Sequence, residues 1–309
     1  MKTDPSSHRK LSLIALPGAC DLTEKLGREL GVATEKLEYR RFPDGESHLR
    51  LPSASVANEV ALVARLDRPD ARIPAVLFAA ALARDLGAAR VGLIAPYLPY
   101  MRQDIRFSPG EALTSVTFAR WISNHFDWLV TVDPHLHRYH SLDEIYSIAS
   151  AVVPAAPALA EWITANVEQA VVIGPDMEST QWVAAVAAHC KLPWRVMTKE
   201  RFGDHEVRID APDLSGLAGH VPVLVDDIIS SGATLADSAR ALRQAGMPAP
   251  VCAIVHGLFG EQSRQTLARA GIKRIVCSDS TRVAEAEIEL APLLAPAVAG
   301  LVSAACLID

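Results

Sequence analysis

The sequence predicts an α/β protein built on parallel sheets. Short apolar runs without strict alternation recur along the chain, as expected for strands covered on both faces. Helical patterns separate these runs, so that strand and helix alternate. Polar clusters follow several of the apolar runs, where the carboxyl ends of the strands would lie and where ligands of such sheets bind.

The alternation can be followed from the first element to the last. The predicted strands are 11–18, 60–66, 90–98, 128–132, 169–174 and 222–229, and the clearest helical patterns are 21–30, 73–87 and 235–246. The last stretch, Leu290–Ile308, has no charged residue and approaches the length of a membrane span. Because it contains Pro292, Pro296 and Gly300, a buried terminal helix is the better prediction.

A break in the pattern divides the chain near its middle. Val152–Ala158 contains two prolines, and 309 residues are enough for two domains. We therefore expect one domain over 1–153 and another over 154–291, with a helix at about 292–309 that packs back on the first. Two copies of one fold are possible, although no strong residue-level repeat is visible.

Charge and cysteine usage narrow the classes of function. The formal net charge is −6, whereas a nucleic-acid binder would carry a basic excess. The five cysteines are scattered, which is typical of a reduced cytosolic protein. The apolar run Leu11–Leu16 is too short for a secretory signal. We expect a cytoplasmic protein that binds neither nucleic acid nor membrane.

The most informative stretch is Val221–Leu235. An apolar run leads into Asp226 and Asp227, and a small-residue loop then precedes a helical pattern. The loop consists of Ser230, Ser231, Gly232, Ala233 and Thr234. Backbone N–H groups and the positive end of a helix dipole make such a loop suitable for a phosphate monoester. A capped helix start without a ligand is the alternative.

Two further clusters lie in the first half of the chain. Arg41–Glu46 contains Pro-Asp-Gly and by itself predicts a turn between two strands. Arg102 and Gln103 follow the strand 90–98, and the forked donors of an arginine suit phosphate. An exposed ion pair is the ordinary alternative for Arg102.

Three more clusters carry carboxylates, histidines or paired cations. Asp133 and His135 are two residues apart on a segment expected to be extended, so both can face one Mg²⁺ ion or phosphate chain. Zinc is a competing interpretation, but no cysteine or glutamate completes a site. Asp176 follows another predicted strand. Lys199 and Arg201 precede a polar, Gly-containing loop and can close over a phosphate, or can be solvated surface.

Taken in order, these clusters resemble the ribose-phosphate diphosphokinases, also called phosphoribosyl-diphosphate (PRPP) synthetases. That family shows F-x-D-G-E, P-Y-x-x-Y-x-R-Q-D, D-x-H, P-D, K-x-R and a ribose-phosphate loop, and all six appear here in order. His256–Phe259 and Ala291–Leu294 also match its pattern. Within Arg102–Thr114, the run RFSPGEALT is similar to the archaeal-type branch.

The resemblance implies two tandem type I phosphoribosyltransferase-like domains, with ATP bound on the first and ribose 5-phosphate on the second. It implies ATP contacts for Phe42, Asp44, Gly45, Glu46, Arg102, Gln103 and His135, with Phe42, Asp44 and Glu46 reaching the ATP of a neighbouring subunit. It implies metal contacts for Asp133, His135 and Asp176, and ribose 5-phosphate contacts for Arg201, Asp226, Asp227, Ser230, Ser231, Gly232, Ala233 and Thr234. Lys199 and Arg201 would be catalytic and lie on a mobile loop.

The resemblance also implies a reaction and a cofactor. It implies Mg²⁺-dependent transfer of diphosphate from ATP to ribose 5-phosphate, by a homo-oligomer of two or more subunits. The alternatives are a phosphoribosyltransferase that consumes PRPP and a non-catalytic regulatory homologue. Ser230-Ser231 replaces the Asp-Thr that is common in the family, and Met177-Glu178-Ser179 follows Pro-Asp where many members have Gly-Gly. These departures leave subunit packing and allosteric control open.

Overall fold

The computed structural model describes residues 11–202 and 206–304, without the side chains of 199–209 and 304. The chain divides into two compact units. The first comprises the described residues up to Val153 and those from Ala291 onward, and the second comprises Pro154–Leu290. Among all the residues that the structure describes, no helix is long and apolar enough to span a membrane.

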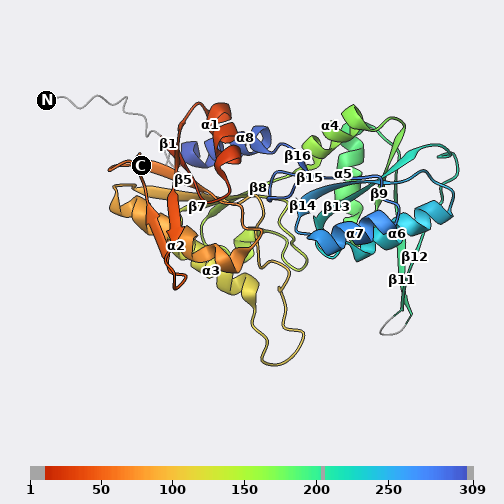
Figure 1. Cartoon of the computed structure of the whole chain (residues 1–309), viewed down its shortest axis with the longest axis horizontal. Coiled ribbons are helices and arrows are strands. Elements are labelled where there is room, and N and C mark those ends of the chain that lie inside the picture. Colours follow the sequence, from red (N-terminus) through yellow and green to blue (C-terminus); the bar gives the residue numbers. More distant parts are fainter. Residues whose placement is uncertain (1–10, 203–205, 305–309) are drawn as a thin grey trace. The chain divides into compact units, whose positions relative to one another are not determined.

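The first unit contains a six-stranded parallel sheet. Its strands, in spatial order, are β2 (Ala33–Lys36), β1 (Leu11–Ala15), β5 (Glu59–Val63), β6 (Arg90–Ile94), β7 (Trp128–Val132) and β8 (Ala149–Val153). Its helices are α1 (Cys20–Leu30), α2 (Ile73–Asp85), α3 (Thr114–His125) and α8 (Ala291–Ala304). Helices α1 and α8 cover one face and α2 and α3 the other (Figure 1).

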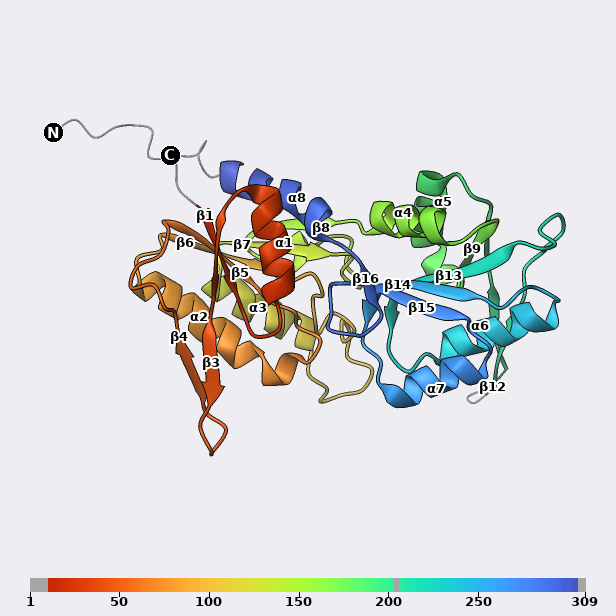
Figure 2. The same ribbon diagram turned by 45° about the horizontal axis from the view of Figure 1, so that its top comes forward.

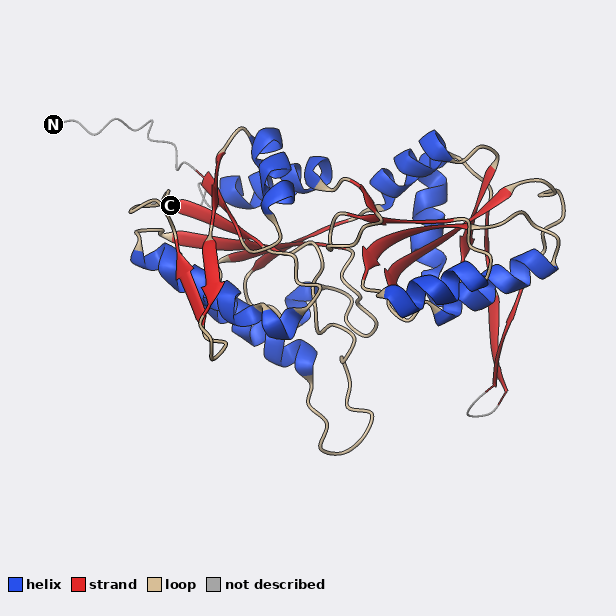
Figure 3. Ribbon diagram, in the orientation of Figure 1, coloured by secondary structure: helices blue, strands red, loops and turns tan. Residues whose placement is uncertain are grey.

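The second unit contains another six-stranded parallel sheet. Its strands, in spatial order, are β10 (Trp194–Val196), β9 (Ala170–Gly174), β13 (Val221–Ile229), β14 (Val251–Gly257), β15 (Arg274–Ser278) and β16 (Ala286–Ile288). Its helices are α4 (Ala156–Asn166), α5 (Thr180–Cys190), α6 (Ala233–Gln244) and α7 (Glu261–Arg269). Helices α4 and α5 lie on one face and α6 and α7 on the other (Figure 3).

The two sheets have the same strand order relative to the chain. In each unit the first strand pairs with the second, and the later strands are added one by one on its other side. Helix α8 contacts α1 in the first unit as α4 contacts α5 in the second. The chain is therefore one fold used twice, and the predicted α/β class with helices on both faces is confirmed.

Each unit also carries an antiparallel hairpin between its second and third sheet strands. In the first unit it consists of β3 (Glu38–Arg41) and β4 (Ser47–Arg50), which project from the sheet (Figure 2). In the second it consists of β11 (Thr198–Phe202) and β12 (Glu206–Asp210). Short 3-10 turns complete the fold at Pro69–Ala71, Leu142–Glu144 and Met177–Ser179.

Burial of the central strands explains why the sequence predicts them. All residues of β5, β7, β9 and β14 are buried, because helices cover both faces of each sheet. The edge strands β2 and β10 are exposed or half-buried, so they have no apolar run that would reveal them in the sequence.

Candidate active site

The carboxyl ends of β9 and β13 form the polar edge of the second sheet. The pairing of β9 with β13 ends at Ile173 and Leu224, whereas β14 continues alongside and pairs with Asp226 through Ile254. The strand predicted over 222–229 therefore agrees with β13 (Val221–Ile229), and its pairing with β14 extends to Ile229. As a result, Asp226 lies on a part of β13 that continues beyond β9.

Negative charge accumulates around Asp226. Burial of this carboxyl group, followed by the negative charges of Asp227 and Asp176, raises its pKa well above the ordinary value. The backbone N–H of Asp227 donates to Asp226 Oδ1 at 3.1 Å, and Asp227 is 5% exposed. The three acidic residues therefore produce a site at which a cation or a hydroxyl donor is favourable.

The small-residue loop leads directly into helix α6. Gly232 precedes the helix with φ of 76°, and its carbonyl accepts the Ala236 N–H at 2.9 Å. Ser231 Oγ accepts the Ala233 N–H at 3.4 Å, and Ser263 Oγ donates to the Ser230 carbonyl at 3.0 Å. The first turn of α6 thus presents its N–H groups at the loop, as an anion site requires.

Replacing Gly232 by alanine is expected to destabilise this loop. Its φ lies in the left-handed region, and an added Cβ would lie 3.1 Å from the Leu267 side chain. The backbone conformation alone costs an L-residue roughly 1–2 kcal/mol. Urea unfolding measures the loss, and Gly246→Ala is the control, because Gly246 has φ of 83° and open space around it. Equal stability of Gly232→Ala and the natural protein would contradict this conformation.

Asp176 lies at the start of a 3-10 turn directly after β9. Its Oδ1 accepts the N–H groups of Glu178 at 3.1 Å and Ser179 at 3.3 Å. Ser179 Oγ donates to the Asp176 carbonyl at 2.5 Å. Gly174 leaves the space for this hydroxyl, since a Cβ there would lie 2.4 Å from it. Glu178 and Ser179 thus belong to a turn that holds Asp176 at the sheet edge.

Lys199 and Arg201 lie on β11. The family resemblance implies a mobile loop here, and the backbone forms a hairpin in which Lys199 pairs with Ile209 and Arg201 with Val207. The two residues are thus two positions apart on the backbone of one strand. Their side chains lie outside the described residues, as does the tip of the hairpin.

In the first unit, Phe42–Glu46 is the turn of the β3–β4 hairpin. The Phe42 N–H donates to the Glu46 carbonyl at 2.8 Å, and Asp44 Oδ1 accepts the Glu46 N–H at 3.1 Å. The Phe42 ring is 38% exposed, and the Arg40 guanidinium lies 4.4 Å from its centroid. An exposed aromatic ring beside a cation is a suitable surface on which to stack a base.

Arg102 and Gln103 begin the long connection between β6 and α3. Arg102 is exposed, and Gln103 Oε1 accepts a hydrogen bond from Thr114 Oγ1 at 3.1 Å. Farther along, Glu111 accepts the Phe107 N–H at 2.8 Å. The connection is therefore stabilised at its base, next to Gln103, and again near its tip.

Asp133 and His135 follow β7, but the segment is not extended as predicted. Asp133 has φ of 32°, so residues two apart no longer share a face by strand geometry. His135 instead lies against His137, with ring centroids 5.3 Å apart. Both Asp133 and His135 are half-buried at the carboxyl end of the first sheet.

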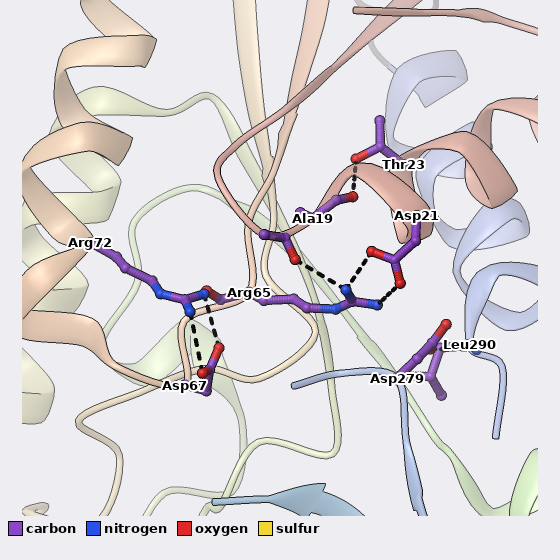
Figure 4. A network of polar contacts seen from close by, with 9 residues as sticks. Ala19, Asp21, Thr23, Arg65, Asp67, Arg72, Asp279 and Leu290 are labelled. Carbon is purple, nitrogen blue, oxygen red and sulfur yellow. Dashed lines mark hydrogen bonds and ion pairs between the residues drawn. The ribbon is translucent and has the colours of Figure 1, made fainter. Parts of the chain in front are cut away.

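Sequence analysis missed one buried cation in the first unit. Arg65 is 4% exposed and donates to Asp21 at 2.6 and 2.9 Å and to the Gly18 carbonyl at 3.0 Å (Figure 4). Arg72 and Asp67 form a second ion pair nearby, at 2.9 Å. The residues of the Arg65 pair are far apart in sequence, so no local pattern indicated it.

The structure brings some of the predicted site residues together, whereas Phe42–Glu46, Lys199 and Arg201 lie on the two hairpins. Asp176, Asp226 and Ser230–Thr234 lie at one edge of the second sheet, while Asp133 and His135 lie at the end of the first. Within the described residues, no three His, Cys, Asp or Glu side chains form a ready metal cage. The raised pKa of Asp226 nevertheless fits a cation, and Mg²⁺ bound mainly through substrate phosphates needs only one or two carboxylates.

Comparisons with known proteins agree with this architecture. Residues 11–125 match the N-terminal domain of ribose phosphate pyrophosphokinase, and residues 141–291 match the phosphoribosyl transferase domain. The chain also resembles the crystal structure of phosphoribosylpyrophosphate synthetase from Mycobacterium smegmatis, with a TM-score of 0.79 at 22% identity over 96% of this chain and 99% of that one. The fold and the loop thus define the class: a protein with two tandem phosphoribosyltransferase-type domains, as predicted.

Sequence relatives define the family within that class. The ribose-phosphate pyrophosphokinase of Methanopyrus kandleri is 32% identical over 291 residues, which cover 94% of this chain and 99% of the relative. That of Halobacterium salinarum is 33% identical over 282 residues, or 91% of this chain and 96% of the relative. The chain belongs to the ribose-phosphate pyrophosphokinase family, which confirms the resemblance noted in its motifs.

Proposed function

We propose that this chain transfers diphosphate from ATP to the 1-hydroxyl of ribose 5-phosphate, giving PRPP and AMP. The observation that carries the proposal is the near full-length match to relatives named ribose-phosphate pyrophosphokinase. A phosphoribosyltransferase would use the loop of the second unit, but it would leave the first unit, which matches the pyrophosphokinase N-terminal domain, without a role.

In this proposal the second unit, Pro154–Leu290, binds ribose 5-phosphate. The hydroxyls and N–H groups of Ser230–Thr234, at the start of α6, donate to the 5-phosphate. Asp226 accepts hydrogen bonds from the ribose hydroxyls, and the negative charge of Asp227 and Asp176, which contributes to its raised pKa, supports this role. Asp227, which is buried beside Asp226, adds negative charge to this part of the site.

The first unit binds ATP. The exposed Phe42 ring stacks on the base, while Asp44, Gly45 and Glu46 shape the turn around it. Arg102 and Gln103 bind phosphate and base groups. His135 and Asp133 bind the metal ion and the phosphates of ATP. In the second unit, Asp176 is the carboxylate assigned to a metal ion. Mg²⁺, when bound, supplies positive charge that neutralises the ATP phosphates.

The reaction requires little covalent chemistry from the side chains of the protein. The 1-hydroxyl oxygen attacks the β-phosphorus, its proton is released, and the bond from the β-phosphorus to the oxygen bridging to the α-phosphorus breaks, so that AMP leaves. Lys199 and Arg201 stabilise the negative charge that develops on the β-phosphate and the bridging oxygen. Positioning of the two substrates supplies the remainder of the rate enhancement.

Phosphorus NMR tests the proposal directly. The protein is mixed with ATP, Mg²⁺ and ribose 5-phosphate, and AMP is expected to appear together with a sugar-linked diphosphate. Release of ADP would mean transfer of a single phosphate and would overturn the β-phosphorus assignment. No change in a protein that binds ATP would instead favour a non-catalytic regulatory homologue and direct attention to Glu178 and Ser179.

We further propose that the enzyme is a cytoplasmic homo-oligomer. Phe42 lies at the tip of a hairpin that projects from its own sheet (Figure 2), which is a suitable position for contacting a neighbouring subunit. Light scattering of the purified protein measures the subunit number, and a monomer with full activity would refute this part of the proposal.

A further inference from the structure

The loop between β5 and α2, residues 64–72, has a counterpart in the second unit. Because β5 takes the place in the first sheet that β13 takes in the second, this loop corresponds to the segment that carries Asp226 and Ser230–Thr234. The two loops have different chemistry. Both contain two aspartates, but the counterpart adds hydroxyl residues, whereas the β5–α2 loop adds Arg65, Arg68 and Arg72.

Ion pairs hold the β5–α2 loop at both ends. Arg65, almost fully buried, binds the carboxylate of Asp21 and the carbonyl of Gly18 after β1 (Figure 4). Arg72 pairs with Asp67 at 2.9 Å and donates to the Arg65 carbonyl. The guanidinium groups at the two ends therefore fix the loop itself.

One side of this loop contacts the β3–β4 hairpin. Arg41 donates from its guanidinium to the Ala71 carbonyl at 2.9 Å. Arg41 Nε also donates to the Tyr39 hydroxyl at 2.8 Å, and this hydroxyl lies 3.2 Å from Ser47 Oγ. A continuous set of hydrogen bonds thus connects both strands of the hairpin to the loop, one residue from Phe42.

The other side contacts the connection that carries Arg102. The Tyr100 hydroxyl donates to Asp70 Oδ1 at 2.5 Å, and the Tyr100 ring packs on Phe118 with centroids 5.0 Å apart. Burial, followed by the hydrogen bond and charge of Asp70, raises the pKa of Tyr100 well above its ordinary value, so the hydroxyl remains a donor. Tyr100 has φ of 64°, an uncommon conformation for a non-glycine residue.

We propose that the β5–α2 loop is a brace that positions the two ATP-binding elements of the first unit. Asp70 acts through Tyr100 on the segment that carries Arg102, and the Ala71 carbonyl acts through Arg41 on the turn that carries Phe42. This inference rests on the proposed function, because it takes these two elements to be the ATP-binding ones. It holds equally if the hairpin serves the ATP site of a neighbouring subunit.

The expected effect of breaking the brace is specific to ATP. A single hydrogen bond at a partly exposed position changes an equilibrium about threefold to tenfold. Asp70→Ala is therefore expected to raise the KM for ATP about threefold to tenfold, with the KM for ribose 5-phosphate and kcat little changed. Tyr100→Phe keeps the packing on Phe118 and should have the same effect.

The pair of variants forms a double-mutant cycle. If Asp70 and Tyr100 act through their shared hydrogen bond, the double variant should raise the KM for ATP no more than either single variant. Asp127→Ala is the matched control, since Asp127 bonds Arg84 and the Val91 N–H in the same unit without contacting the brace. It should lower the melting temperature and leave the KM for ATP unchanged.

Hydrogen exchange in the ligand-free protein supplies a readout that does not depend on activity. Asp70→Ala should increase amide exchange in residues 38–50 and 99–104, whereas Asp127→Ala should not. If the natural protein makes no PRPP, the proposed function fails, and ATP binding by calorimetry together with exchange still tests the brace. The brace is overturned if Asp70→Ala and Tyr100→Phe leave both ATP affinity and exchange in these segments unchanged.

Discussion

Replacing Lys199 by alanine is expected to lower kcat at least a hundredfold, while the KM for ribose 5-phosphate stays within about twofold. The cation is proposed to act on charge that exists only as the bond to the β-phosphorus breaks. Removing such a transition-state contact costs roughly 2.7–4 kcal/mol, or 10²–10³ in kcat. Steady-state kinetics with each substrate varied in turn measure the effect.

The position of Lys199 on β11 suits this role. The backbone of Lys199 and Arg201 belongs to β11, which pairs with β12 in a hairpin after the second strand of the sheet. Lys273→Ala is the matched control, because Lys273 is exposed and precedes β15 at the opposite end of the sheet from Asp226. Equal losses of ribose 5-phosphate binding and of turnover in Lys199→Ala would argue that this residue binds substrate in the ground state instead.

The central strands could be predicted from sequence because strands that are buried on both faces consist mainly of apolar residues. β7 and β9 are covered by helices on both faces and are buried at every position, so their sequences are apolar apart from Thr131 and Gly174. The candidate site could be predicted for a related reason. Parallel strands bring their carboxyl ends together, which places the residues after β9 near those of β13.

Local geometry could not be predicted in the same way. The strand predicted over 222–229 agrees with β13, but the end of its pairing with β9 at Leu224 and the continuation of its pairing with β14 to Ile229 depend on the neighbouring strands. The positive φ of Asp133 and the pairing of Arg65 with Asp21 likewise depend on residues distant in sequence. Such features arise from tertiary packing, which a reading of local patterns does not include.

The repetition of the fold could not be recognised from residue identities, as the segments at the ends of β5 and β13 illustrate. Topology is maintained by buried apolar residues, and many sequences satisfy that requirement. The two copies differ at the loop after β5, which uses Arg65 internally, and at the last part of β13, which carries Asp226.

Replacing Asp226 by asparagine is expected to weaken ribose 5-phosphate binding about tenfold to a hundredfold. Hydrogen bonds to a charged acceptor contribute roughly 1.5–3 kcal/mol, and an amide of the same shape removes the charge. Calorimetric titration of ribose 5-phosphate measures the loss. The control is Asp237→Asn, because Asp237 is an exposed residue of α6 that pairs with Arg240 on the same helix; its binding should be unchanged.

The same substitution should stabilise the ligand-free protein. Without a bound ligand, the charge of Asp226 is buried and is repelled by Asp227 and Asp176. The folded pKa of Asp226 is raised, so its contribution to stability is present below the unfolded pKa and is lost as pH rises through the folded value. In EDTA at neutral pH, Asp226→Asn should therefore melt about 2–4 °C higher, for a gain of about 1 kcal/mol. The difference should shrink toward acid pH, where the natural carboxyl is protonated. A variant that melts lower at neutral pH and binds ribose 5-phosphate normally would show that Asp226 supports the fold and not the ligand.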